Sequence, residues 1–164
     1  MNRLRWVGLQ YGVQPLITRL LQSEAFRSNF IRLPIRHEVG SLIIENGKAY
    51  VETEEGEDGC AFFGPYEMYP PGVYSVTFNI QVDRDKAGDK SICGRADVSR
   101  YSGTDVLKKA DLFIDQLIRD DGRLTLHFVL NLGCDLEFRV YTNGRARLRV
   151  WTGMAAVPSA SDGI

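Results

Sequence analysis

Aromatic and arginine side chains form the most suggestive chemical set in this sequence. Aromatic rings stack on the apolar C–H face of a sugar ring, and guanidinium groups donate paired hydrogen bonds to carboxylates or neighbouring hydroxyls. We expect the candidates in loops or at strand positions that face away from the core, and they are Tyr66, Tyr69, Tyr101, Arg139, Arg149 and Trp151. Such residues predict a ligand-binding surface. The alternative interpretation is an arginine–glutamate ladder that shields a sheet face, with the aromatic rings packed beneath loops.

The motif Gly64-Pro65-Tyr66 predicts a rigid position for one of these rings. Proline holds its own φ near −65°, and glycine permits a tight turn beside it. A tyrosine held there loses little side-chain freedom when it contacts a ligand. The competing interpretation is that Tyr66 closes the end of the domain and binds nothing.

A catalytic centre is not expected. A hydrolase with a Ser–His or Cys–His pair needs a histidine beside its nucleophile, and the only histidines are His37 and His127. The nucleophile motif G-x-S-x-G does not occur in the sequence. An acidic run could supply paired carboxylates for glycoside hydrolysis, but a solvated loop rarely holds two carboxyl groups at a defined distance. Its members are Glu52, Glu54, Glu55, Glu57 and Asp58. We therefore expect a protein that is not an enzyme.

No cofactor is expected. Residues 83–89 resemble a calcium-binding loop, but Arg84 and Lys86 interrupt the carboxylates and no glutamate follows at the twelfth position. A structural calcium ion held by backbone carbonyls elsewhere stays compatible with the sequence. The cysteines Cys60, Cys93 and Cys134 lack the paired spacing of a disulfide framework or zinc site, so we expect buried free thiols and a reducing, cytoplasmic compartment.

Composition and charge limit the classes of protein to which this chain can belong. The chain has 164 residues, of which 44% are hydrophobic and 25% charged, and this suits one globular domain. The formal net charge of −1 excludes nonspecific electrostatic binding of nucleic acid over a broad surface, because such binding needs a surplus of basic residues. The first residues do not read as a signal peptide, and no apolar stretch approaches the roughly 20 residues that span a bilayer.

The chain divides into three predicted parts. Residues 1–38 form an N-terminal extension with a short helix over residues 15–30, whose apolar stripe includes Leu16, Leu20 and Leu21. That helix would pack on the domain or on another subunit. Residues 39–157 form the domain itself, and residues 158–164 form a disordered tail.

Strand patterns dominate the middle of the chain. Asn46-Gly47 predicts a two-residue hairpin between residues 41–45 and 48–53. Residues 73–83 and 123–130 alternate between apolar and polar side chains, as half-buried strands do. A final hairpin is expected between residues 136–141 and 145–151. Residues 104–117 are compatible with either a strand or a helix.

The fold class that follows is all-β: an antiparallel β-sandwich, or jelly roll, of roughly eight strands with a short N-terminal helix. Its predicted core consists of the inward-facing apolar residues of these strands. They are Leu42, Ile44, Val51, Phe62, Tyr74, Val76, Phe78, Ile80, Leu124, Leu126, Phe128, Phe138, Val140, Leu148 and Val150.

The run FFGPYEMYPPGVYSVTF, residues 62–78, resembles a pattern of galactose-binding-like jelly-roll domains associated with bacterial glycosyltransferases and other polysaccharide-biosynthesis proteins. The runs ADVSRYSG, LTLHFVL and LEFRVYTNGRARLRV fit the same pattern, so the resemblance covers about residues 42–151. It implies a carbohydrate-binding-module-like fold. The first 35 residues and the acidic loop lie outside it.

Two functions are therefore expected, from different classes. The first is a non-catalytic carbohydrate-binding module that recognises a carbohydrate or nucleotide-sugar-derived ligand beside a glycosyltransferase or another protein partner. The second is a structural or assembly domain that docks a partner, or forms a homodimer, through its helix and an exposed sheet face. Neither function requires nucleic acid or a membrane span.

Overall fold

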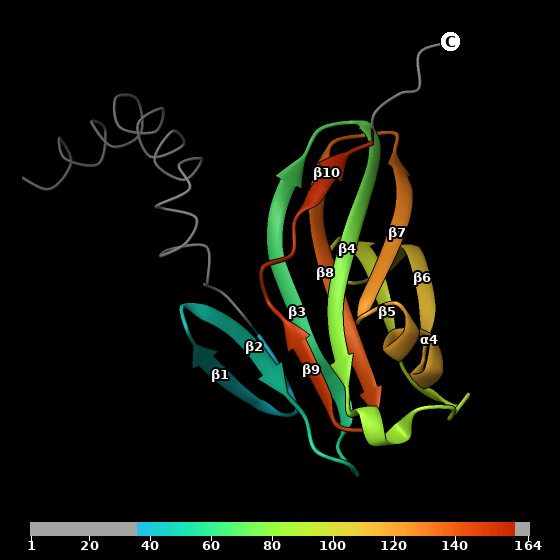
Figure 1. Ribbon diagram of the computed structural model, residues 1–164. Helices are drawn as coiled ribbons and strands as arrows, with labels where there is room; N and C mark the ends of the chain where they lie inside the picture. The colour runs from blue at the N-terminus through green and yellow to red at the C-terminus, as the bar shows by residue number, and fades with distance from the viewer. Residues whose placement is uncertain (1–35, 160–164) are drawn as a thin grey trace, which may run out of the picture. The chain divides into compact units, whose positions relative to one another are not determined.

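A computed structural model describes residues 36–159, which form two antiparallel sheets packed against each other (Figure 1). The six-stranded sheet has the order β1-β2-β9-β4-β10, with β7 paired to β4, and the four-stranded sheet has the order β3-β8-β5-β6. This confirms the predicted antiparallel β-sandwich. The expected N-terminal helix lies outside the described residues.

The strands follow in this order: β1 (Ser41–Glu45), β2 (Lys48–Glu52), β3 (Asp58–Tyr69), β4 (Gly72–Val82), β5 (Ile92–Arg100), β6 (Asp105–Phe113), β7 (Arg123–Leu130), β8 (Cys134–Asn143), β9 (Leu148–Trp151) and β10 (Ala156–Pro158). Two short helical segments accompany them, the 3-10 helix η2 (Arg84–Lys86) and the α-helix α4 (Ile114–Arg119). The last strand ends at Pro158, where the sequence placed the start of the tail. Within the described part of the chain, no helix has the length and apolar character needed to cross a bilayer.

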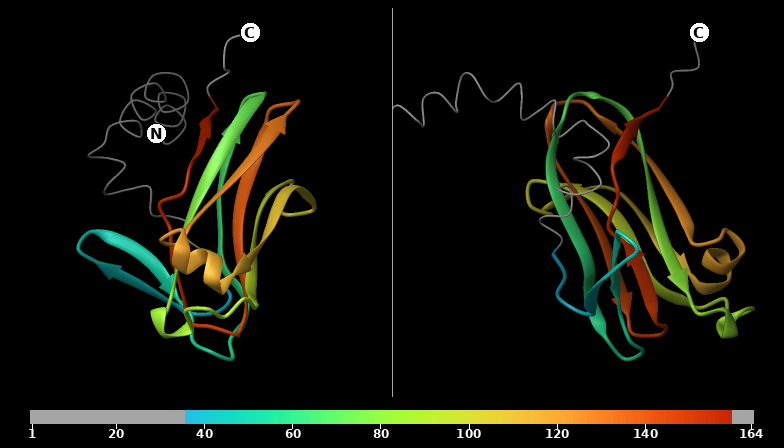
Figure 2. Two further views of the ribbon diagram at one scale, coloured as in Figure 1. Left: turned by 45° about the vertical axis from the view of Figure 1, so that its right-hand side comes forward. Right: turned by 60° about the vertical axis from the view of Figure 1, so that its left-hand side comes forward.

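The β1–β2 hairpin has the predicted register, with Glu45 opposite Lys48 and Leu42 opposite Val51. Its side-chain environment differs from the prediction, because Leu42 is 41% exposed and Ile44 65% exposed, so neither belongs to the core. Figures 1 and 2 show the hairpin projecting from the side of the sandwich. Both residues face the side of the sheet on which the core lies, but no described strand of the second sheet covers them there.

The strands β4 and β7 pair along most of their length and confirm the predicted alternation. Phe78 and Ile80 are fully buried on the inner side of β4, whereas Asn79 and Gln81 are exposed on its outer side. One expected core residue, Leu124, is only partly buried. It lies at the start of β7, where a small hollow beside α4 leaves one side of its side chain open.

The predicted final hairpin is wrong. Strand β8 pairs with β3 and β5 in the four-stranded sheet, while β9 pairs with β2 and β4 in the other sheet. The connection between them crosses from one sheet to the other. Its Gly144 carbonyl accepts a hydrogen bond from the backbone N–H of Gly56, in the loop between β2 and β3 (2.7 Å). Phe138 and Leu148 are still buried, because each points inward from its own sheet.

The ambiguous segment of residues 104–117 contains both elements, since β6 runs directly into α4. The helix buries Ile114 and Leu117 against the core. The three thiols are free and buried, as expected. Core residues outside the predicted set are Ala61, Ala96, Val98, Leu112, Ile114, Leu117, Leu130, Leu136, Ala146, Met154 and Ala156, together with Cys93 and Cys134.

Candidate functional site

The six predicted site residues do not come together. Tyr66 and Arg139 lie on the outer side of the four-stranded sheet, and Tyr101 lies in the turn after β5. Because β8 and β9 are in different sheets, Arg149 and Trp151 lie on the outer side of the six-stranded sheet instead. Two outer faces therefore have to be compared as binding surfaces.

Tyr69 belongs to neither face. Its ring packs edge-on against Tyr74 and Phe138, with centroid distances of 5.7 and 6.2 Å, so it lies at the end of the core between the sheets. Its hydroxyl accepts a hydrogen bond from the backbone N–H of Ala156 (3.3 Å). Burial raises the pKa of Tyr69 to about 12. These contacts stabilise the core, so we assign Tyr69 a structural role.

On the four-stranded sheet, the alternation of β5 and β8 places polar residues opposite each other: Asp97 faces Arg139 and Ser99 faces Glu137. The guanidinium of Arg139 donates to both carboxylate oxygens of Asp97, at 2.7 and 3.1 Å. Tyr66 Oη donates to Glu137 Oε1 at 2.7 Å. We call these five residues, Tyr66, Asp97, Ser99, Glu137 and Arg139, the closed cluster.

The turn after β5 covers the closed cluster. The carbonyl of Gly103 accepts a hydrogen bond from Arg139 Nη1 (3.2 Å), and a Cβ atom added to Gly103 would lie 2.4 Å from that nitrogen. Asp97 is 1% exposed and Glu137 is 4% exposed. The ring of Tyr141 beside them lies under Arg95, whose Cζ is 4.3 Å from the ring centroid. The donors and acceptors of this face are thus largely used within the protein.

Desolvation and the bond to Glu137 raise the pKa of Tyr66 to about 12. The hydroxyl of Tyr66 therefore stays protonated and donates to the carboxylate at physiological pH. This supports the interpretation of Tyr66 as a structural residue that holds Glu137.

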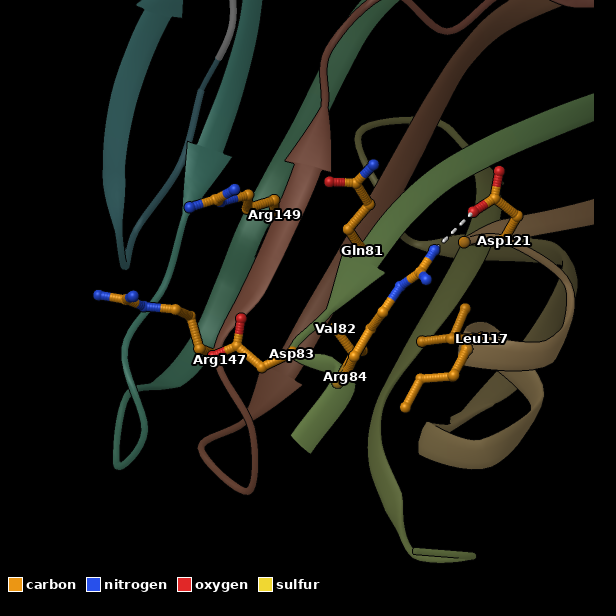
Figure 3. A pocket seen from close by; sticks show the side chains of 10 residues that line it. Gln81, Val82, Asp83, Arg84, Leu117, Asp121, Arg147 and Arg149 are labelled. Carbon is orange, nitrogen blue, oxygen red and sulfur yellow. Dashed lines mark ion pairs between the residues drawn. The ribbon is translucent and has the colours of Figure 1, made fainter. Parts of the chain in front are cut away.

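The six-stranded sheet carries the hollow shown in Figure 3, with a volume of about 230 Å³. Val82, Leu117 and Ile118 provide apolar surface within it. Around them lie polar and charged side chains from β4, η2, the turn before β7 and the start of β9: Gln81, Asp83, Arg84, Asp121, Arg147 and Arg149. A hollow with apolar surface and a hydrogen-bonding rim matches the two surface types of a sugar ring.

Ion pairs hold the arginines at the rim of this hollow. Arg84 lies 3.8 Å from Asp121, although both side chains are almost fully exposed. Arg147 donates to Glu54 from Nε at 3.1 Å and Arg149 donates to Glu52. Figure 3 shows the guanidinium groups of Arg147 and Arg149 directed away from Arg84. The hydrogen bond from Arg147 lowers the pKa of Glu54, so this pair stays charged at neutral pH.

Polar residues that are exposed or partly exposed continue along the outer side of the same sheet. The ladder between β4 and β7 pairs Asn79 with Arg123, Thr77 with Thr125 and Ser75 with His127. Beside Arg149, the rings of Trp151 and Tyr50 pack against each other, with 4.8 Å between their centroids. We call the hollow and these neighbouring residues the open face.

Side chains of the open face are available to a ligand. The amides of Asn79 and Gln81 and the guanidinium of Arg123 are exposed and make no side-chain hydrogen bond to another described residue. These three residues lie in predicted strands but are not among the predicted site residues. The alternation that places Phe78 and Ile80 in the core also directs Asn79 and Gln81 outward, and this signal could have found them.

Residues 36–159 contain no group of three or more histidine, cysteine, aspartate or glutamate side chains placed to hold a metal ion. The segment that resembles a calcium loop forms η2. Within it, Lys86 Nζ lies 2.7 Å from Glu55 Oε1, and Asp89 Oδ1 accepts a hydrogen bond from the backbone of Ser91. These carboxylates serve local ion pairs and turns.

No protein-family model and no curated protein matches the sequence. Among solved structures, the chain is similar to one reported as "CBM4 structure and function", with a TM-score of 0.50, 10% identity and coverage of 73% of this chain and 89% of that one. A chain from the accessory secretory protein 1, 2 and 3 structure of Streptococcus pneumoniae also matches (TM-score 0.47, 13% identity, 75% and 95% coverage). So does a family 35 carbohydrate binding module from an environmental isolate (TM-score 0.43, 11% identity, 76% and 92% coverage).

At such low identity the likeness concerns the fold. The class of the domain is a jelly-roll β-sandwich like that of the CBM4 structure, which confirms the fold that the sequence resemblance implied.

Proposed function

We propose that this domain is a non-catalytic carbohydrate-binding module whose ligand lies on the open face of the six-stranded sheet. The observation that carries the proposal is the hollow of about 230 Å³, with its apolar surface, its polar rim and the exposed amides beside it. The fold, like that of a CBM4 structure, supports the same function. A sugar ring would rest on Val82 and Ile118 and exchange hydrogen bonds with Gln81.

A glycan array with the full chain identifies the ligand, and calorimetry with the best glycan then locates the site. Replacing Gln81 or Arg123 by alanine removes exposed hydrogen-bonding groups of the open face. We expect each change to weaken binding about tenfold, as the loss of one hydrogen bond worth about 1.4 kcal/mol does. Nucleotide sugars are titrated in parallel, because they are the alternative ligand class.

The matched control is Arg95→Ala, which removes an exposed arginine from the other sheet. It should leave the affinity unchanged. If Arg95→Ala weakens binding while Gln81→Ala and Arg123→Ala do not, the ligand lies beside the closed cluster and the assignment to the open face is wrong. No binding to any glycan or nucleotide sugar would remove the proposed function itself.

We further propose that the module acts in the cytoplasm of bacteria beside polysaccharide-biosynthesis enzymes, with a glycosyltransferase as the partner. The resemblance of residues 62–78 supports this setting, and the three buried free thiols suit a reducing compartment. Cross-linking in cells followed by mass spectrometry tests it. Recovery of a glycosyltransferase with the chain is expected, and consistent recovery of unrelated proteins alone would contradict the proposal.

A further inference from the structure

The β1–β2 hairpin exposes apolar side chains on a strand at the edge of the sheet. Leu42 and Ile44 lie on one side of β1, with 41% and 65% of their surface exposed. Ile43 lies on the other side, opposite Tyr50. Within residues 36–159, β1 pairs with β2 alone, so its second edge has no strand partner there.

The backbone groups on that edge can be identified from the register. The two-residue turn at Asn46-Gly47 makes Glu45 and Lys48 a hydrogen-bonded pair. Hydrogen-bonded and non-hydrogen-bonded pairs alternate in an antiparallel ladder, so Ile43 also bonds to β2 through its backbone. The N–H and C=O groups of Leu42 and Ile44 consequently point away from β2, toward the free edge.

Three other strands at the edges of the sandwich, β3, β6 and β10, have features that hinder pairing. Strand β6 carries Lys108 and Lys109 on its edge, and β10 has three residues and ends at Pro158. The backbone of Arg36 bonds to Phe63 and so covers part of β3. Charged residues, proline, short length and covering segments are the usual means of blocking an edge. Between its polar end residues, β1 has three apolar residues in succession and no charge or proline, and no segment of residues 36–159 covers its free edge.

We propose that two copies of this chain form a dimer by pairing their β1 strands antiparallel about a two-fold axis at Ile43. In this register Leu42 of one copy lies opposite Ile44 of the other, and both residues offer their backbone groups to that edge. Their side chains fall on the same side of the joined sheet and bury each other. Ile43 meets its symmetry mate on the opposite side.

The charges of β1 favour this register. Antiparallel pairing about Ile43 places Glu45 opposite Ser41 of the second copy, with no like charges facing each other. In-register parallel pairing would instead align Glu45 with Glu45 of the other copy, which is unfavourable. The strand Ser-Leu-Ile-Ile-Glu therefore complements a second copy of itself only in the antiparallel orientation. Antiparallel pairing of identical strands gives a dimer with two-fold symmetry.

Such a dimer has one continuous sheet with both open faces on the same side, because residues opposite each other in an antiparallel ladder point the same way. Two sites on one side could contact one polysaccharide chain at the same time and raise its apparent affinity. This consequence rests on the proposed function, whereas the dimer itself does not depend on it.

The test is the mass of the full chain by sedimentation equilibrium at increasing protein concentration. We expect a dimer in the wild type and a monomer in Ile44→Pro, since proline removes an N–H group that faces the free edge and does not serve β2. The double variant Leu42→Lys/Ile44→Lys places lysines opposite each other and should weaken the dimer at least tenfold. Circular dichroism and melting curves verify that each variant is folded.

The matched control is Leu132→Lys/Val157→Lys, which changes two other exposed apolar residues in the same way and should leave the dimer intact. A second measurement fixes the register: Ile43→Cys should form an intersubunit disulfide under mild oxidation, because non-hydrogen-bonded pairs bring Cα atoms to about 4.5 Å. Leu132→Cys should not.

A wild-type chain that stays monomeric up to about 0.5 mM, well above common dimer affinities, would overturn the proposal and point to another occupant of this edge. A dimer that persists unchanged in both Ile44→Pro and the double lysine variant would place the interface elsewhere. Neither result bears on glycan binding, which is measured separately.

Discussion

The outer faces of the two sheets carry similar residue types and differ in how these residues are paired. On the four-stranded sheet, Asp97 and Arg139 bond to each other beneath the turn that contains Gly103. On the six-stranded sheet, Gln81 and Arg123 are exposed. A buried charged group must find its partners within the protein, whereas an exposed one can exchange water for a ligand. Arginine and tyrosine content alone therefore does not identify a binding face.

The largest loss of unfolding free energy should come from Arg139→Met in the closed cluster. Asp97 would remain 1% exposed without its hydrogen-bonded guanidinium, with only Arg95 left at 3.8 Å, and such a loss costs about 3–5 kcal/mol of unfolding free energy. Urea unfolding measures the change. The double variant Asp97→Leu/Arg139→Met should recover much of the loss, because it removes both charges. A cost below about 1 kcal/mol for the single variant would show that water compensates Asp97.

A smaller loss, about 2 kcal/mol, is expected for Gly103→Ala. Its φ of +81° disfavours any side chain, and the new Cβ would lie 2.4 Å from Arg139 Nη1. The control is Gly153→Ala, where a Cβ meets nothing within 4 Å. If both variants have the same melting temperature, the turn does not hold the cluster closed.

Tyr66→Phe should cost about 1 kcal/mol, the net worth of the hydrogen bond to Glu137. It should not change glycan affinity, since Tyr66 belongs to the closed cluster. Chemical denaturation and calorimetry measure the two quantities. Weaker glycan binding at unchanged stability would reverse the assignment and make Tyr66 a ligand contact, as the sequence first indicated.

Tyr66 and Tyr69 predict a loss of folding stability at alkaline pH. Folding raises the pKa of Tyr66 and Tyr69 to about 12, from about 10 in an unfolded chain. The folded state thus keeps protons that the unfolded state loses, so the stability from these tyrosines is complete below pH 10 and falls as the pH rises toward 12. Absorbance titration should show tyrosines that ionise late, with one fewer in Tyr66→Phe. Ionisation of all tyrosines near pH 10 in the folded protein would contradict this.

The smallest effect on stability should come from the open face. Arg123→Ala removes an exposed side chain and should change the unfolding free energy by less than about 0.5 kcal/mol. Its melting temperature should stay within about 2 °C of the wild type. A large destabilisation would mean that Arg123 has a structural role, and the contrast between the two faces would weaken.

Local patterns in the sequence determined much of the fold. Alternation around Phe78 and Phe128 identified two strands and the direction of their side chains, because a strand's side-chain period is a property of its own backbone. Asn46-Gly47 identified a hairpin and its register, since the turn type depends on a few adjacent residues. These signals were sufficient for the sandwich class, for most of the core and for the outward direction of Arg139 and Arg149.

Pairing between distant segments was decided only by the tertiary structure. No local feature of residues 134–151 shows that β8 pairs with β3 and β5 while β9 pairs with β2 and β4, so Arg139 and Arg149 could not be assigned to opposite faces. Likewise, Leu42 and Ile44 have the inward register of a core strand. Their exposure depends on where the second sheet ends, because a side chain is buried only if another part of the fold lies over it.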